Sequence, residues 1–96
     1  MSNDRLSLIR NALVVLQPLQ LELQDDSHKH AGHQGARDGR GHFSLYIVSE
    51  HFVGLSPVLR HKSVYGALGD LLKTDIHALA IQAKTPDEAE LQANFR

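Results

Sequence analysis

A short apolar run at residues 76–83, with the sequence Ile-His-Ala-Leu-Ala-Ile-Gln-Ala, constrains the fold of this chain more than any other stretch. Apolar side chains occupy both alternating faces of the run, as in a strand buried between helices and a neighbouring strand. Polar residues close it on both sides, with Asp75 before it and Thr85 after it. We therefore predict a buried strand with one unusual member, His77. Because His77 alternates with Leu79, we expect its ring at the rim of the core, where the strand begins.

The composition indicates one small soluble domain that covers residues 1–96. The chain is 42% hydrophobic with a net charge of -1, which gives no bulk electrostatic reason to bind nucleic acid. It has seven histidines but no cysteine, which excludes disulfides, thiol catalysis and metal sites built from its own thiolates. No apolar run approaches the roughly 18 residues of a membrane span, and the N-terminus lacks a signal-peptide layout. We expect a cytoplasmic protein that does not bind membranes.

Helical and alternating patterns follow one another in the order α-β-β-α-β-α. The expected elements are a helix ending before Pro18, strands at 19–24 and 42–49, a helix from Ser56 to about Leu72, the strand at 76–83 and a short final helix after Thr85. The final helix opens with a capping box, in which Glu88 follows Thr85 by three residues. This order predicts an α+β fold, a two-layer sandwich with a three-stranded mixed sheet and helices on one face.

A polar segment at residues 25–41 joins the first two strands and is unusually long for a connection inside a compact domain. Strands joined by a loop are expected to be antiparallel, whereas the second and third strands, joined by a helix, are expected to be parallel. Parallel strands begin at the same edge of a sheet, so the strand starts at His42 and His77 should lie together. The polar segment leaves from that edge, and its histidines should converge on His77. They are His28, His30 and His33.

Converging imidazoles indicate metal binding, because neutral histidine is a ligand for zinc, copper, nickel and iron. The residues alone leave a second interpretation open, in which the segment is a solvated polar insertion and His77 bonds a backbone carbonyl.

Catalysis is not expected. The serines lack the setting of a nucleophile, and no glycine-rich phosphate loop stands between a strand and a helix. We therefore predict that the chain is not an enzyme.

Three basic residues, Arg60, His61 and Lys62, lie in the first turns of the main helix. The helical periodicity leaves Arg60 and Lys62 on the outside. Cations at such positions can contact the phosphates of DNA, and an ordinary solvated helix face is the alternative.

Four stretches of the sequence resemble the BolA family. They are Ser-His-Lys-His-Ala-Gly-His at 27–33, Gly-His-Phe-Ser-Leu-Tyr-Ile-Val-Ser at 41–49, Phe-x-Gly-x-Ser-x-Val-x-Arg-His-Lys-x-Val-Tyr-x-Ala-Leu at 52–68 and Ile-His-Ala-Leu-Ala-Ile-x-Ala-x-Thr-Pro at 76–86. The resemblance implies a fold like the class II KH domain, in agreement with the predicted order. It also implies a monothiol glutaredoxin as partner, so that the chain is a monomer alone and a heterodimer with glutaredoxin.

The resemblance further implies a [2Fe-2S] cluster shared with glutaredoxin and glutathione, in cluster trafficking or in iron and redox sensing. Glutaredoxin and glutathione supply the thiolates, and the BolA-like chain supplies histidines. Carried over to this sequence, the strand ligand is His77, and the Ser-x-x-His-Ala pattern implies His30 as the loop ligand. His28 and His33 are close enough to remain alternatives. Imidazole in place of thiolate lowers the negative charge of such a cluster, as in Rieske centres.

The same family includes DNA-binding transcriptional regulators of stress response and cell morphology, which gives the alternative function. Arg60, His61 and Lys62 are then the candidate nucleic-acid contacts. The segment Gly-Leu-Ser-Pro at 54–57 departs from the Gly-x-x-Gly clamp of nucleic-acid-binding KH domains. We expect the cluster function rather than the DNA function.

Overall fold

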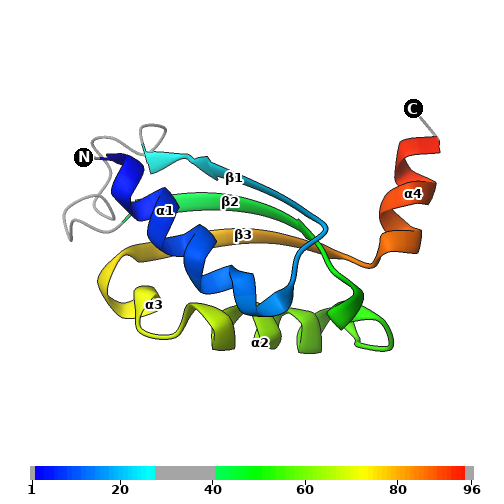
Figure 1. Ribbon diagram of the computed structural model, residues 1–96. Helices are drawn as coiled ribbons and strands as arrows, with labels where there is room; N and C mark the ends of the chain where they lie inside the picture. The colour runs from blue at the N-terminus through cyan, green and yellow to red at the C-terminus, as the bar shows by residue number, and fades with distance from the viewer. Residues whose placement is uncertain (1, 28–40, 95–96) are drawn as a thin grey trace.

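The computed structural model describes residues 2–27 and 41–94 (Figure 1). Its elements are α1 (Ser2–Leu13), the 3-10 helix η1 (Val14–Leu16), β1 (Gln20–Asp25), β2 (Gly41–Val48), the 3-10 helix η4 (Glu50–Phe52), α2 (Pro57–Leu68), α3 (Leu71–Thr74), β3 (Ile76–Lys84) and α4 (Pro86–Asn94). The predicted order is confirmed, with a separate short helix added before β3. Among these elements, no helix has the length and the apolar character needed to cross a membrane.

The three strands form one sheet in the order β1-β2-β3. The β1 and β2 strands are antiparallel, whereas β2 and β3 are parallel, as the connections predict. The central strand β2 has the predicted alternation, because Phe43, Leu45 and Ile47 are buried between half-buried neighbours. The sequence therefore predicted the α+β class, the mixed sheet and its strand directions.

Helices α1 and α2 cover one face of the sheet, and α4 extends away from the end of β3 (Figure 1). The core between the two layers joins Ile9 and Leu13 of α1 to Val64 and Leu68 of α2. Phe52 of η4 is fully buried in the same cluster. Among the described elements, no helix covers the opposite face of the sheet (Figure 1).

The main helix is shorter than predicted. It ends at Leu68, and its cap, Gly69, has a φ of 54° and donates its N–H to the carbonyl of Tyr65. Glycine tolerates positive φ without the steric cost that other residues have, which makes it the usual residue at such a helix end. The prediction of one helix up to Leu72 was wrong because apolar residues continue at helical spacing through Leu71 into α3.

The strand at residues 76–83 is not the buried strand that was predicted. It is an edge strand in the described sheet, and Ile76 is its one fully buried side chain. Ala78, Ala80 and Gln82 are exposed on the face that no helix covers. The error has a physical reason, since alanine counts as apolar in the pattern but is small enough to stand in water at little cost.

Candidate functional site

The start of β3 carries one residue more than the strand it pairs with. Gly41 is paired with Ile76, but the next residue of β2, His42, is paired with Ala78, which makes His77 the extra residue. A bulge of this kind bends the strand and redirects the side chain. Ile76 is buried as a result, with 3% exposure, whereas His77 is exposed. His77 nevertheless lines the same hollow as Leu79, so its predicted place at the rim of the core is confirmed.

The bulge brings the imidazole of His77 next to that of His42. Their ring centroids lie 5.0 Å apart, and the ring planes are tilted by 52°. His42 is half-buried, while His77 is exposed. The expected convergence of the two strand starts is therefore confirmed, with an inner and an outer imidazole at one end of the sheet.

Both ends of the segment 28–40 are attached beside these two rings. The side chain of Ser27 accepts a hydrogen bond from the N–H of His42 at 3.1 Å, and Asp26 donates its N–H to the carbonyl of His42 at 2.7 Å. Gly41 donates its N–H to the carbonyl of Asp75 at 2.9 Å. The segment thus departs and returns at the end of the sheet that presents His77, as predicted.

Helix α1 helps to hold the start of β3 in place. The Nε of Arg5 lies 3.3 Å from Oδ2 of Asp75, directly before the strand. The hydroxyl of Thr74 donates to the other carboxylate oxygen of Asp75. The Thr74 hydroxyl, and after it Arg5, lower the pKa of the Asp75 carboxyl. An ionised Asp75 therefore connects α1 to the residues that position His77.

The predicted loop ligands His28, His30 and His33 lie outside the described residues. Within residues 2–27 and 41–94, no three His, Asp or Glu side chains converge to hold a metal ion. The donor set that the structure does bring together is the imidazole pair of His42 and His77. Neutral imidazole is a suitable ligand for the irons of a [2Fe-2S] cluster, and His77 is exposed enough for a partner to reach. The residues present therefore fit such a cluster, with further donors required from elsewhere.

The predicted nucleic-acid residues do not form a uniformly exposed patch. Arg60 was expected on the outside, but its side chain is only 13% exposed. Its two terminal nitrogens lie 2.6 and 3.1 Å from the two carboxylate oxygens of Glu88. The guanidinium also donates to the carbonyls of Leu55 and Ala83 at 2.9 and 3.1 Å. Lys62 is exposed and His61 is half-buried, so within this trio Lys62 is the side chain most open to a phosphate.

The ion pair between Arg60 and Glu88 attaches α4 to α2. The guanidinium of Arg60, and after it the N–H of Thr85, lower the pKa of Glu88 to about 2. The predicted capping box is confirmed, because the N–H of Thr85 donates to Oε1 of Glu88 at 3.0 Å and the N–H of Glu88 donates to Oγ1 of Thr85 at 3.3 Å. No sequence signal distinguished this paired arginine from a solvated one, since 28 residues separate it from Glu88.

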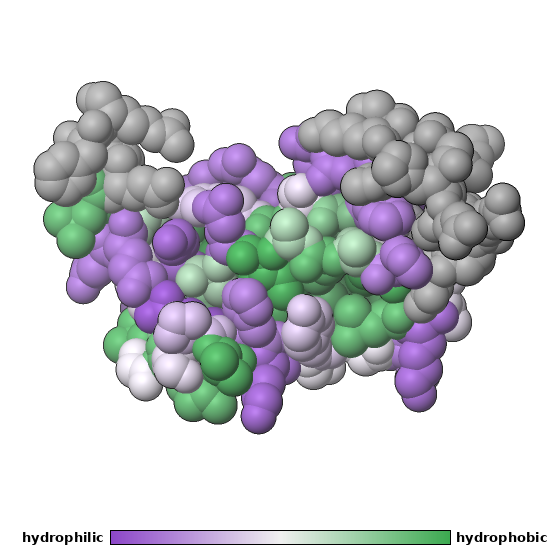
Figure 2. All heavy atoms as spheres, turned by 180° about the vertical axis from the view of Figure 1, so that it is seen from behind, coloured by the Kyte–Doolittle hydropathy of each residue, from purple (hydrophilic) through white to green (hydrophobic). Residues whose placement is uncertain are grey.

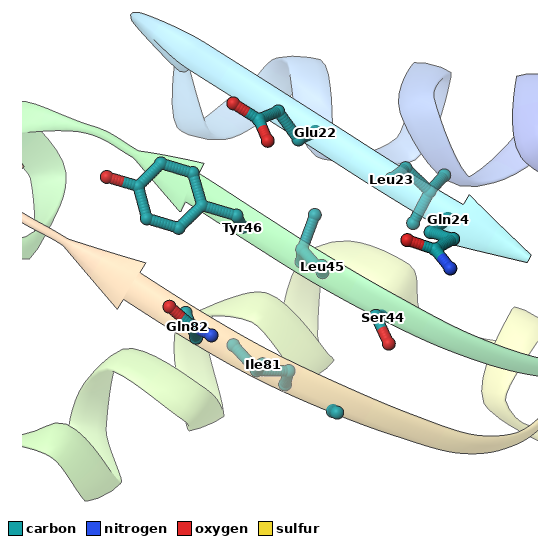
Figure 3. Close-up of a pocket in the computed structure, with 9 residues that line it drawn as sticks. Glu22, Leu23, Gln24, Ser44, Leu45, Tyr46, Ile81 and Gln82 are labelled. Carbon is teal, nitrogen blue, oxygen red and sulfur yellow. The ribbon is translucent and has the colours of Figure 1, made fainter. Parts of the chain in front are cut away.

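The sheet also carries a shallow hollow of about 470 Å³, which both polar and apolar side chains line (Figure 3). A row of side chains, Glu22, Tyr46 and Gln82, crosses it from β1 to β3, in agreement with the strand register. Ser44 donates a short hydrogen bond to Asp26 on the same face. The polar groups of the hollow can bind water or a ligand.

A family model described as BolA-like protein matches residues 13–88. SufE-like protein 1, chloroplastic/mitochondrial, of Arabidopsis thaliana is 50% identical over 78 residues, which are 76% of this chain and 21% of that protein. Protein BOLA1, chloroplastic, of the same plant is 44% identical over 77 residues, which are 77% of this chain and 48% of that protein. The chain thus spans less than half the length of these two relatives.

Solved structures agree with the sequence matches. BolA1 from Arabidopsis thaliana superposes with a TM-score of 0.73 at 42% identity, over 85% of this chain and 92% of that one. The BolA domain of SufE1 from the same plant gives a TM-score of 0.72 at 48% identity, over 83% and 90% of the two chains. These matches confirm the resemblance seen in the sequence and the α+β architecture. The chain belongs to the BolA-like protein family.

Proposed function

We propose that this chain binds a monothiol glutaredoxin and, through histidines, co-ligates a bridging [2Fe-2S] cluster, either for cluster trafficking or for iron and redox sensing. The observation that carries the proposal is the exposed imidazole of His77, presented by a bulge beside His42 where the segment 28–40 is attached. This role is one of binding and presentation, without catalysis by the chain itself.

The donor chemistry supports a shared cluster. The chain has no cysteine, so thiolates must come from glutaredoxin and glutathione. His77 supplies one imidazole, and His30, with His28 and His33 as alternatives, supplies the other. When bound, the cluster provides one-electron redox chemistry and a transferable iron–sulfur unit. His42 packs against the ring of His77 and helps to fix its orientation, as outer partners of metal ligands commonly do.

The protonation state of His77 controls its part in this function. Only the neutral imidazole offers a lone pair to iron, so protons compete with the metal for His77. In the free protein the ring of His77 is exposed, so protons from bulk solvent can reach it. A partner that covers the ring would exclude water and reduce the competition.

Visible absorption and circular dichroism test the proposal directly. The chain is mixed with a monothiol glutaredoxin, glutathione, iron and sulfide, and we expect a spectrum that differs from that of the glutaredoxin cluster alone. His77→Ala should remove the difference. His51→Ala is the matched control, because His51 is exposed and its ring lies 3.2 Å from Oε1 of Gln17, away from the site. An unchanged spectrum for His77→Ala would contradict the proposal.

We propose the cytoplasm as the compartment of the protein, on the basis of its sequence. The two Arabidopsis relatives are named for chloroplasts and mitochondria. Cell fractionation with an antibody to the chain tests this proposal, and recovery in an organelle fraction would contradict it.

A further inference from the structure

Ion pairs are found at both ends of β3. The Nε of Arg5, near the start of α1, lies 3.3 Å from Oδ2 of Asp75, the residue directly before the strand. The pair of Arg60 and Glu88 lies at the other end, where the strand passes into α4. Figure 2 agrees with this distribution, because it shows hydrophobic atoms across the middle of one face of the molecule and hydrophilic atoms toward both ends. Asp75 precedes the candidate ligand His77 by two residues, whereas the second pair attaches α4.

The bulge makes the direction of His77 depend on its neighbours. As the extra residue, His77 is skipped by the strand register, which pairs Ile76 and Ala78 on either side of it with consecutive residues of β2. A bulged residue interrupts the ladder locally, so its direction is set by the backbone before and after it. Ile76 is held by the core, with 3% exposure. Asp75, directly before Ile76, is therefore a further point that sets how His77 is presented.

Asp75 is held by contacts with three parts of the fold. Its backbone carbonyl accepts the N–H of Gly41 at 2.9 Å, which joins the start of β2 to that of β3. Its own N–H donates to the carbonyl of Leu71 at 2.9 Å, in α3. Its carboxylate accepts hydrogen bonds from the adjacent Thr74 and from Arg5, which is 70 residues away in the sequence. The contact with Arg5 can therefore be removed without changing the sheet or α3.

Arg5 belongs to a helix that is fixed in the core. Ile9 and Leu13 of α1 are fully buried, so the guanidinium reaches Asp75 from an element with a defined position. The two side chains of the pair are 34% and 22% exposed. A hydrogen bond between charged groups is stronger than one between neutral groups, so this contact restrains the start of β3 from the helical layer.

We propose that Arg5 is a positioning residue of the cluster site. Acting through Asp75, it holds the start of β3 so that the bulge presents the ring of His77 in one direction. Contacts outside the ligand shell commonly orient metal ligands in this way. The inference rests on the proposed cluster function, and it adds to that function a residue of α1 that is not itself a ligand.

The first measurement uses the free full-length chain, where no cluster is needed. Arg5→Gln removes the charge, and amide-resolved NMR follows the N–H of Gly41 that donates to the carbonyl of Asp75. We expect the hydrogen exchange of this amide to quicken by about two- to fivefold, the range of a partly exposed ion pair, and the ring signals of His77 to shift. Arg10→Gln is the matched control, because Arg10 is exposed on the same helix, and it should leave both readouts unaltered.

The second measurement uses the complex with glutaredoxin, glutathione, iron and sulfide. We expect Arg5→Gln to form the mixed-ligand cluster with an altered visible circular dichroism, and to lose it to a chelator about two- to fivefold faster than the natural chain. Arg5→Lys should recover much of the natural behaviour, since it restores a cation. Glu88→Gln removes the ion pair at the other end of β3 and should leave the spectrum and the rate unaltered, which separates positioning from a general loss of stability.

A double-mutant cycle assigns the effect to Asp75. Asp75→Asn should alter the spectrum and the rate in the same direction as Arg5→Gln. Combining the two substitutions should add little, because both remove the same interaction.

The outcomes separate this inference from the proposed function. Unchanged exchange at Gly41 with unchanged ring signals of His77 in Arg5→Gln would overturn the inference alone. Additive effects in the cycle, equal cluster lifetimes for Arg5→Gln and the natural chain, or an equal effect of Glu88→Gln would also overturn it. Identical cluster spectra for His77→Ala and the natural chain would instead overturn the proposed function, and the inference with it.

Discussion

His42 and His77 face one another at the start of the β2–β3 pair, with ring centroids 5.0 Å apart, although the strand register pairs His42 with Ala78. The bulge at His77 is the reason. It inserts one residue into β3, so that Ile76 enters the core while His77 turns outward beside His42. The same residue therefore interrupts the ladder, bends the strand and presents the candidate ligand.

Replacing His77 by alanine should abolish the mixed-ligand spectrum of the glutaredoxin complex. Docking should be weakened but detectable, since it also uses protein surface. The free energy of unfolding should fall by no more than about 1 kcal/mol, because an exposed side chain contributes little to the core. Absorption spectroscopy, pull-down of glutaredoxin and urea unfolding measure the three quantities. A folded His77→Ala protein with the natural cluster spectrum would contradict the proposed function.

Substitution of the other histidines should identify the second ligand. His30→Ala is expected to resemble His77→Ala, whereas His28→Ala and His33→Ala should have smaller effects. His42→Ala should change the spectrum only moderately if His42 orients His77 without binding iron. Acidification should weaken the natural complex in the same direction, since protonated imidazole cannot ligate iron. Resonance Raman spectra of the five variant complexes distinguish these cases.

The strand order and the convergence at His77 were predictable from the sequence because they follow from general rules. Alternation identifies β2, the helix between the last two strands makes them parallel, and parallel strands begin together. Those rules alone place His42, His77 and both ends of the long segment at one end of the sheet. The structure confirms each of these placements.

The remaining features depend on tertiary contacts that a local pattern does not contain. The bulge arises from the register of β3 against Gly41, which the sequence of β3 alone does not specify. Arg60 turns inward because Glu88 and the carbonyls of Leu55 and Ala83 surround it, and these partners are distant in sequence. The loop ligands lie outside the described residues, so their assignment still rests on the family resemblance.

Gly41→Ala should destabilise the attachment of the long segment. A Cβ at this position would lie 2.7 Å from the Phe43 ring and 2.9 Å from Oγ of Ser27. The ring is buried and cannot move freely, so overpacking should cost about 1 to 3 kcal/mol of unfolding free energy. Gly66→Ala is the matched control, because a Cβ there meets nothing within 4 Å and α2 should be stabilised by about 0.5 to 1 kcal/mol. Urea unfolding with equal values for both variants would contradict the close packing at Gly41.

DNA binding is best tested with Lys62→Ala, because Lys62 is exposed and Arg60 is engaged in the fold. If DNA binds, this change should weaken it and reduce its salt dependence, since one phosphate contact is lost. Arg60→Ala should in addition lower stability by releasing Glu88. We expect only weak binding at physiological salt in fluorescence anisotropy. Tight binding of a DNA site with about a thousandfold discrimination over random DNA would favour the regulator function instead.

The pair of Arg60 and Glu88 should make stability depend on pH in the acid range. The folded pKa of Glu88 is lowered from 4.5 to about 2 by Arg60 and the N–H of Thr85. A lowered folded pKa means that this stabilisation is fully present above pH 4.5 and is lost as the pH falls toward 2. The Glu88 side chain is 43% exposed, so solvent screening limits the contribution to about 1 kcal/mol or less.

Glu88→Gln keeps an oxygen that accepts the Thr85 N–H but removes the charge, so the loss of stability on acidification should be smaller than in the natural chain. Glu90→Gln, an exposed change in the same helix, is the control and should leave the pH profile unaltered. Urea unfolding at about pH 6 and about pH 3 measures the difference, and parallel pH profiles for the natural chain and Glu88→Gln would show that the pair does not stabilise the attachment of α4.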